Sequence, residues 1–237
     1  MFRRFIFTSS PADLMEIDLK RENARRLAAE FAENGDAFGW FEALYKEAAG
    51  DNDHIPWADL EPNRFFREWA EKTGLKGDGQ KALVVGCGLG DDAKYLHDLG
   101  FKVTAFDISP TAIEWARRLY AGAEIQFETA DLFQPFRGWL GAFDFVLEVY
   151  TIQPLPMEMR SKVIDAIAAF VGGGGGKLVV VCRGREDDEE PDQLPWPLSR
   201  NDLSGFEENG LIQTYFEEIW DEEDEQKRFV VEYARSS

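Results

Sequence analysis

Short apolar runs alternate with amphipathic stretches through most of the chain. From Lys81 onward, runs of strand character are separated by segments of about ten to fifteen residues with helical spacing. The runs read KALVV, KVTAF, EIQFE, FDFVLE and KLVVVCR. This alternation is typical of repeated βαβ units. The sequence therefore predicts an α/β fold with a Rossmann-like, doubly wound and mostly parallel sheet.

Single residues locate several helix ends between these runs. Gly100 is suited to end a helix over residues 91–99, because glycine adopts the left-handed conformation without a Cβ penalty. Ser109 is expected to cap the next helix, with Pro110 at its first position. The glycines of residues 172–176 are expected to end the helix that precedes KLVVVCR.

The two ends of the chain differ from this central pattern. A last helix is predicted near residues 199–209, followed by β-like runs at 211–220 and 227–233 that acidic residues join as a hairpin. The sheet is therefore expected to end antiparallel. Residues 1–75 have a helical pattern and no strand-like run, so we expect them to form a cap or lid. Residues 76–237 are expected to form the core of one compact domain.

Charge and hydropathy limit the partners of the chain. Of 237 residues, 45 are Asp or Glu and 26 are Lys or Arg, for a net charge of −19. Such a chain repels a phosphate backbone, so we expect no nucleic-acid partner. No stretch approaches the roughly eighteen consecutive apolar residues of a membrane-spanning helix. The opening MFRRFIFTSS is too short and mixed for a secretory signal, so we expect a cytoplasmic protein without a membrane partner.

The acidic residues are unevenly distributed. Residues 186–192 and 217–225 are strongly acidic, and we expect both runs in solvated loops. They serve solubility or, alternatively, select a cationic or neutral partner molecule. Two cysteines, Cys87 and Cys182, are too few for a disulfide framework, and no metal site is expected.

A glycine-rich segment follows the first predicted strand. Residues 86–90 read G-C-G-L-G and are followed by Asp91 and Asp92 at the start of a helix. A dinucleotide fingerprint places its third glycine three residues after the second, where this chain has Asp91. Carboxylates at a helix N-terminus already complement its dipole and disfavour a phosphate. S-adenosylmethionine suits the segment better, because it has no phosphate and carries sulfonium and ammonium cations.

Two further acids follow the next two strands. Asp107 ends the second strand, where its carboxylate can accept hydrogen bonds from two ribose hydroxyls. Asp131 follows the third strand in ETADLF, where it can accept a hydrogen bond from the adenine amino group. The carboxyl ends of parallel strands meet at one edge, so we expect these acids and the glycine-rich segment to line one crevice.

These motifs resemble a known family. VVGCGLGDD, FDIS and ADLF look like the motifs of the seven-stranded class I methyltransferases, and the resemblance extends from about Phe38 to the C-terminus. The order W-F-E-A-L-Y, I-P-W, G-C-G-L-G-D-D and P-L-P-M-E-M-R is similar to the thiopurine and thiol methyltransferase branch. The resemblance implies strand order 3-2-1-4-5-7-6 with the last strand antiparallel. It also implies that Trp57 packs near the methionyl end of the cofactor and that Asp92 supports the loop. Cys87 and Cys182 would lie about 10 Å apart, too far for a disulfide.

The expected site residues fall into a cofactor group and an acceptor group. The cofactor group comprises Trp57, Gly86, Cys87, Gly88, Gly90, Asp92, Asp107, Ile108, Asp131, Leu132 and Glu148. The candidate catalytic residues, expected to position the acceptor, are Tyr150, Gln153 and His54. Further candidates near the acceptor are Trp40, Tyr45, Arg183 and Trp196.

Each acceptor candidate has a structural alternative. Trp40 and Tyr45 can equally be helix packing, and Trp196 can anchor its loop. Arg183 can hold an anionic acceptor group or pair with the acidic run that follows, and we favour the pair. His97 lies mid-helix and is expected at the surface.

The favoured hypothesis is an enzyme that transfers a methyl group from S-adenosylmethionine to the sulfur or nitrogen of a small molecule, leaving S-adenosylhomocysteine. In-line displacement at an activated carbon depends mainly on positioning, so no strong base is obligatory. A noncatalytic cofactor-binding partner, a protein methyltransferase and a nicotinamide-dependent oxidoreductase are the alternatives, the last disfavoured by the glycine spacing. Both a monomer and a homodimer are compatible with the sequence.

Overall fold

A computed structural model describes residues 11–191 and 193–236. The chain divides into two compact units, Met1–Ala58 and Asp59–Ser237. The opening MFRRFIFTSS, on which the expectation of no secretory signal rested, lies outside the described residues. No helix in the described ranges is both long and apolar enough to cross a membrane.

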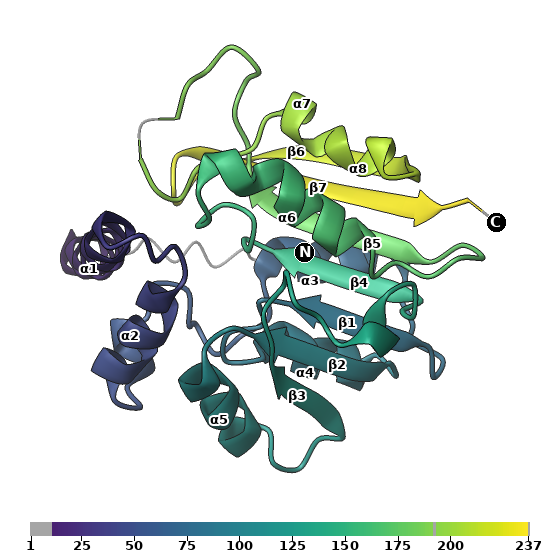
Figure 1. Ribbon diagram of the computed structural model, residues 1–237, viewed down its shortest axis with the longest axis horizontal. Helices are drawn as coiled ribbons and strands as arrows, with labels where there is room; N and C mark the ends of the chain where they lie inside the picture. Colours follow the sequence, from purple (N-terminus) through teal and green to yellow (C-terminus); the bar gives the residue numbers. More distant parts are fainter. Residues whose placement is uncertain (1–10, 192, 237) are drawn as a thin grey trace, which may run out of the picture. The chain divides into compact units, whose positions relative to one another are not determined.

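The second unit is built on a seven-stranded sheet with the order β3-β2-β1-β4-β5-β7-β6 (Figure 1). The strands are β1 (Lys81–Val85), β2 (Lys102–Asp107), β3 (Ile125–Thr129), β4 (Phe145–Val149), β5 (Lys177–Arg183), β6 (Leu211–Asp221) and β7 (Gln226–Arg235). β7 runs antiparallel to both of its neighbours, and the other pairings are parallel. The expected fold class, strand order and antiparallel last strand are confirmed.

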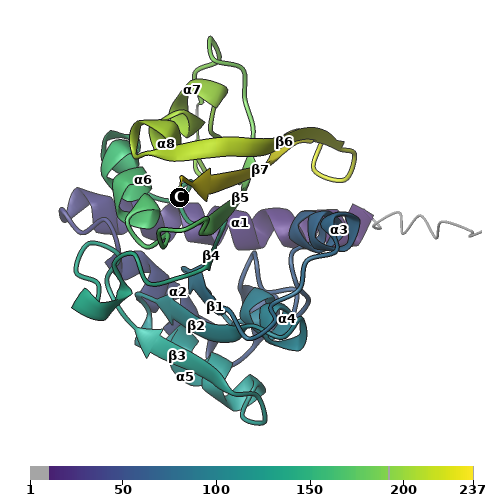
Figure 2. The same cartoon turned by 90° about the vertical axis from the view of Figure 1, so that its right-hand side faces the viewer.

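Helices cover both faces of this sheet (Figure 2). One face carries α3 (Arg64–Thr73), α4 (Asp91–Asp98) and α5 (Pro110–Leu119), and the other carries α6 (Arg160–Ala168), α7 (Arg200–Leu203) and α8 (Gly205–Glu208). The predicted cap of α5 is present, because Ser109 Oγ accepts a hydrogen bond from Ala112 N at 3.0 Å. The last predicted helix, over residues 199–209, is instead two short helices divided at Ser204.

The core beneath α3 is aromatic. Phe66 stacks on Trp69 with a centroid separation of 6.1 Å, and both rings pack near Phe145 of β4. Phe101, which precedes β2, lies 5.2 Å from the Phe145 ring. These rings join α3 to β4 and to the residue before β2, and α3 belongs to the sheet unit although its sequence lies within residues 1–75.

The second acidic run differs from its prediction. Residues 217–221 lie in β6 rather than in a loop, and only the remainder forms the turn into β7. Asp221 is 4% exposed and is ion-paired with Arg64 and Arg228. This half of the run therefore has a structural role, whereas Glu186 to Glu190 of the first run are exposed as expected.

The first unit contains α1 (Pro11–Glu33), α2 (Gly39–Ala48) and the single-turn helix η1 (Asn52–His54). Trp40 and Tyr45 of α2 are almost fully buried. Trp57 packs edge-on against both rings and donates a hydrogen bond from Nε1 to Tyr45 Oη at 2.9 Å. The three aromatic side chains thus form a small core of their own.

Candidate functional site

The glycine loop, residues 86–90, connects β1 to α4. Gly86, Gly88 and Gly90 have φ values of 58°, 52° and 91°, a region that side chains with a Cβ rarely adopt. A Cβ on Gly86 would lie 2.5 Å from Thr151 Oγ1, and one on Gly90 would lie 2.7 Å from the Phe127 ring. The backbone conformation therefore favours glycine at all three positions, and neighbouring side chains leave no room for a Cβ on Gly86 or Gly90.

Asp107 ties the glycine loop to the end of β2. Its Oδ2 accepts a hydrogen bond from Gly88 N at 2.9 Å, and its Oδ1 accepts one from Ser109 N at 2.9 Å. The residue is 8% exposed. A carboxylate oxygen can accept more than one hydrogen bond, so Asp107 can orient the loop and still accept from a ligand.

Asp131 occupies the corresponding place after β3. Its two carboxylate oxygens accept hydrogen bonds from Phe133 N at 2.8 Å and from Gln134 Nε2 at 3.0 Å. Leu132 beside it is buried, and Ile108, which follows Asp107, is half-buried. β2 and β3 are parallel neighbours, so both acids lie at the edge of the sheet that holds the glycine loop.

The two acids that open α4 face protein groups. Asp91 accepts a hydrogen bond from Tyr120 Oη, and Asp92 Oδ1 accepts one from Asn63 N at 2.8 Å. Burial raises the pKa of Asp91 and raises that of Asp92 to about 7. The argument that two full negative charges repel phosphate is therefore weakened, since Asp92 is partly protonated near neutral pH. The glycine spacing still disfavours a dinucleotide.

Glu148, near the end of β4, is completely buried. Its Oε1 accepts hydrogen bonds from Thr151 N at 2.5 Å and Ile152 N at 3.1 Å, whereas Oε2 has no partner among the described residues. Burial raises its pKa to about 7. The carboxyl group holds the turn that follows β4, and no hydrogen bond links it to the glycine loop within the described chain.

The site fits S-adenosylmethionine. The glycine loop places the half-buried Gly86 and Cys87 after β1, and Asp107 and Asp131 provide acceptors at successive strand ends. Burial raises the pKa of the Cys87 thiol well above its usual range, so this side chain is a neutral wall of the loop. Neutral donors and carboxylates match a ligand that carries cations and hydroxyls but no phosphate.

Comparison with known proteins agrees with this geometry. Residues 82–175 match the family model described as a methyltransferase domain. Over these residues the chain therefore carries a methyltransferase domain. It is 28% identical over 125 residues to a 2-heptyl-1-hydroxyquinolin-4(1H)-one methyltransferase of Mycobacteroides abscessus, a match that covers 51% of this chain. The match spans only about half of that protein, 53% of its length.

Solved structures share the fold of the methyltransferase domain over most of the chain. A structure described under conversion of a disulfide bond into a thioacetal group during echinomycin biosynthesis is 25% identical, with a TM-score of 0.65. It covers 83% of this chain and 91% of its own. The N-methyltransferase NodS of Bradyrhizobium japonicum, in complex with S-adenosylhomocysteine, is 19% identical with a TM-score of 0.62. That match covers 81% of this chain and 96% of NodS.

Two acceptor candidates of the sheet unit, Tyr150 and Gln153, contact other residues of the chain. Tyr150 has a φ of 57°, and its ring lies 5.8 Å from the Arg228 guanidinium. Gln153 is fully buried, and its Oε1 accepts a hydrogen bond from Arg183 N at 2.7 Å. Gln153 thus holds the end of β5, and its Nε2 lacks a partner among the described residues.

Arg183 pairs with an acid of the second acidic run. Its guanidinium lies 3.6 Å from Asp224 in the β6–β7 turn, and its pairing with the run that follows it in sequence remains a prediction. The β6–β7 hairpin thus brings an acid that is distant in sequence to the carboxyl end of β5.

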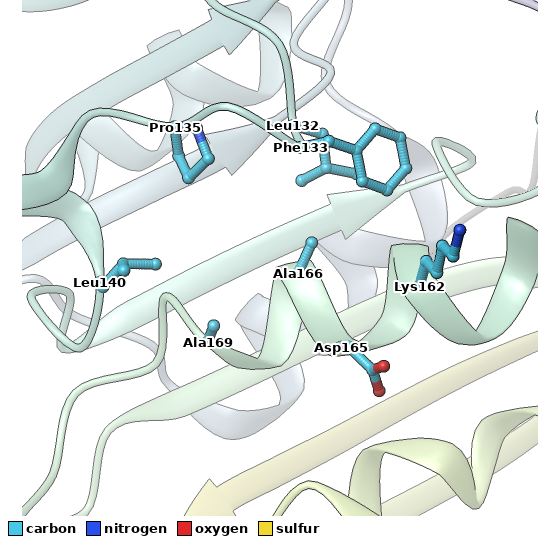
Figure 3. Close-up of a pocket in the computed structure, with 8 residues that line it drawn as sticks. All are labelled: Leu132, Phe133, Pro135, Leu140, Lys162, Asp165, Ala166 and Ala169. Carbon is cyan, nitrogen blue, oxygen red and sulfur yellow. The ribbon is translucent and has the colours of Figure 1, made fainter.

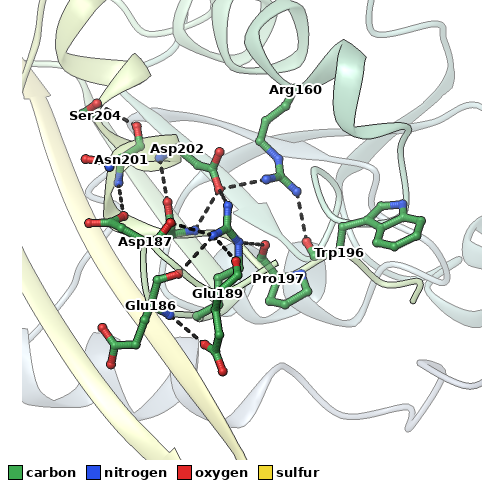
Figure 4. A network of polar contacts seen from close by, with 11 residues as sticks. Arg160, Glu186, Asp187, Glu189, Trp196, Pro197, Asn201, Asp202 and Ser204 are labelled. Atoms are coloured by element: carbon green, nitrogen blue, oxygen red, sulfur yellow. Dashed lines mark hydrogen bonds and ion pairs between the residues drawn. The ribbon is translucent and has the colours of Figure 1, made fainter. Parts of the chain in front are cut away.

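Arg185 holds part of the first run, because its Nη1 donates hydrogen bonds to the backbone oxygens of Glu186 at 3.0 Å and Glu189 at 2.6 Å. It also pairs with Asp202. Arg160 pairs with the same Asp202 (Figure 4).

His54 and Trp57 belong to the N-terminal unit. His54 is exposed, with Nδ1 3.4 Å from Asp51 Oδ2, and Trp57 is 39% exposed. His97 of α4 lies 3.3 Å from Asp98 and is partly exposed, in line with a surface position. The parts they play in binding remain predictions.

An apolar groove of about 450 Å³ lies between the β3–β4 connection and α6 (Figure 3). Leu132, Phe133, Pro135 and Leu140 line one side. Ala166 of α6 and Ala169, which directly follows α6, line the other. Within the described chain, this connection contains no α-helix, only the single turn η2 (Arg137–Trp139). The alternation of strands and helices pointed to a helix at each crossover, so the groove was not predicted.

Residues outside the glycine loop also went unnoticed in the sequence. Asn63 caps α3, and its backbone N–H donates a hydrogen bond to Asp92 Oδ1 at 2.8 Å. Thr151 donates a hydrogen bond from Oγ1 to Val85 O at 2.9 Å. Asn63 had an N-cap signal before an amphipathic helix, whereas no local signal marks Thr151.

Proposed function

We propose that this chain transfers the methyl group of S-adenosylmethionine to a small-molecule acceptor, at sulfur or nitrogen. The observation that carries the proposal is the contact between Asp107 and Gly88 N, which joins the ends of β1 and β2 into one binding edge. The family match over residues 82–175 supports the reaction class. The activity of the whole protein is part of this proposal, because the match spans only part of the curated relative.

Each part of the edge has a distinct task in this proposal. S-adenosylmethionine, when bound, supplies a methyl group already activated by its sulfonium. The backbone of Gly86 and Gly88 receives the methionyl and ribose parts, and Asp107 accepts hydrogen bonds from ribose hydroxyls. Asp131 accepts from the adenine amino group, beside the apolar side chain of Leu132. These residues bind and orient, which is the main requirement of an in-line displacement.

The acceptor is proposed to approach from the carboxyl ends of β4 and β5. Tyr150 provides an aromatic wall there, and the Arg228 guanidinium, 5.8 Å from its ring, fixes its orientation. A small acceptor is supported by the quinolone methyltransferase and by NodS, an N-methyltransferase. The P-L-P-M-E-M-R motif supports a thiol as the acceptor.

The N-terminal unit is proposed to act as the lid, and Trp57 and His54 are the residues that it is proposed to contribute to the site.

A panel of acceptors tests this function. Thiols, amines, phenols and carboxylates are incubated with the chain and S-adenosylmethionine, and production of S-adenosylhomocysteine is measured. We expect turnover with a thiol or an amine, and Asp107→Ala should reduce it while the variant remains folded by circular dichroism. Production of S-adenosylhomocysteine from none of the classes would contradict an enzymatic role, and turnover only with phenols or carboxylates would correct the acceptor atom.

A further inference from the structure

The turn that follows β4, residues 150–153, touches the glycine loop on one side. Thr151 Oγ1 donates a hydrogen bond to Val85 O, the last residue of β1, at 2.9 Å. The same side chain occupies the space that a Cβ on Gly86 would need, with Oγ1 at 2.5 Å and Cγ2 at 2.7 Å from that position. A shift of the glycine loop therefore meets Thr151 directly.

On its other side the turn holds two segments at the acceptor end of the sheet. Gln153 Oε1 accepts a hydrogen bond from Arg183 N, at the end of β5, with a length of 2.7 Å. The backbone oxygen of Gln153 accepts one from Trp196 N at 2.9 Å. Trp196 belongs to the connection between β5 and α7, so one buried residue fixes both segments.

The turn itself is held as one piece. Glu148 Oε1 accepts from the backbone N–H groups of Thr151 and Ile152, which are consecutive. Ile152 and Gln153 are 1% and 0% exposed. Tyr150 at the start of the turn has a φ of 57°, a conformation that persists in a non-glycine residue only when its surroundings fix it. Movement at Thr151 is therefore carried to Gln153.

We infer that Thr151 and Gln153 are positioning residues that couple the glycine loop to the acceptor end of the sheet. Ligand bound at the glycine loop orders the segment around Trp196 through the contacts of Thr151 with Val85 and of Gln153 with Arg183. The inference rests on the proposed function, because it requires the cofactor at the glycine loop. Coupling between two sites is reciprocal, so an acceptor bound near Trp196 also tightens the cofactor.

Hydrogen exchange of the full chain, with and without S-adenosylhomocysteine, tests this coupling. In the wild type, the product should slow exchange at residues 86–90 and also at Arg183 and residues 193–199, by about fivefold or more. Thr151→Val removes the hydroxyl while keeping nearly the same shape. It should keep the effect at residues 86–90 and lose it at Arg183 and residues 193–199.

Two further variants separate coupling from stability. Thr151→Ser keeps the hydroxyl bond to Val85 and should retain the protection. Gln153→Met breaks the contact with Arg183 without touching the glycine loop. It should therefore lose the protection at Arg183 and residues 193–199 as Thr151→Val does, and it replaces that variant in the test if Thr151→Val does not fold. Protection at residues 86–90 alone in the wild type, or full protection in folded Thr151→Val, overturns the coupling and leaves the proposed function intact. Absence of any binding overturns both.

Discussion

At Gly86, both the backbone conformation and the surrounding side chains favour glycine. Its φ of 58° favours glycine, and the nearby Thr151 leaves no room for a Cβ. Gly74 has a similar φ of 67°, but a Cβ there would meet no described atom within 4 Å. A comparison of substitutions at Gly74 and Gly86 therefore distinguishes the cost of backbone strain from the cost of a steric clash.

Gly74→Ala should lower the free energy of unfolding by about 1 kcal/mol, the cost of a left-handed alanine. Gly86→Ala should cost the same strain and about 1–3 kcal/mol more, because Thr151 must move. Chemical denaturation of both variants measures the difference. Equal losses would show that Thr151 yields freely and that the contact does not constrain the loop.

Glu148 makes stability depend on pH in an unusual direction. Its pKa is raised from 4.5 to about 7, so between these values the folded state binds more protons than the unfolded state. The free energy of unfolding therefore falls as pH rises through this window, by on the order of 3 kcal/mol for this group. The contribution is complete at pH below about 4.5 and is lost above pH 7.

Glu148→Gln removes this titration while keeping an oxygen for Thr151 N and Ile152 N. The stability of the variant relative to the wild type should rise between pH 4.5 and 7, and the difference should be flat outside that window. The difference cancels the contribution of Asp92, which titrates in the same range. A difference that does not change with pH would show that Glu148 titrates normally.

At the scale of elements, the β6–β7 hairpin is fixed at its tip by buried charges. Arg228 has a side chain that is 3% exposed and lies 3.0 Å from Asp221 Oδ2, and it also pairs with Asp224. Arg64 of α3 pairs with the same Asp221. Removing one partner of a buried ion pair leaves an uncompensated charge, which is costly.

Arg228→Met should lower the free energy of unfolding by about 3–5 kcal/mol. Lys94→Met breaks the half-exposed pair with Asp98 on α4 and should cost about 1 kcal/mol or less. Thermal or denaturant unfolding of the two variants makes the comparison. A loss below 1 kcal/mol for Arg228→Met would indicate that water reaches the hairpin tip.

Elements with strong local signals were predictable, and those set by distant partners were not. The five parallel strands follow from apolar runs, and the cap at Ser109 follows from its own sequence. The burial of Asp221 depends on Arg64, 157 residues away, so the run was misjudged as a solvated loop. The break at Ser204 likewise divides what the local pattern predicted as one helix.

At the scale of the whole molecule, the donor side was better predicted than the acceptor side. Glycine spacing and strand-end acids are local features that the parallel sheet brings to one edge, and the structure joins Gly88 to Asp107 there. The acceptor side depends on the post-β4 turn and on partners such as Asn63 and Asp224, which no spacing rule connects. Aromatic residues alone did not distinguish pocket from core, as buried Trp40 and Tyr45 show.

The central claim is that the glycine loop and Asp107 bind S-adenosylmethionine. Titration calorimetry of the full chain with S-adenosylhomocysteine tests it most directly. We predict one ligand per chain, with affinity weakened by about 1.5–3 kcal/mol in Asp107→Ala and by less in Asp107→Asn, which keeps one acceptor oxygen. A folded wild-type chain that binds no S-adenosylhomocysteine, or a folded Asp107→Ala with unchanged affinity, would contradict the account.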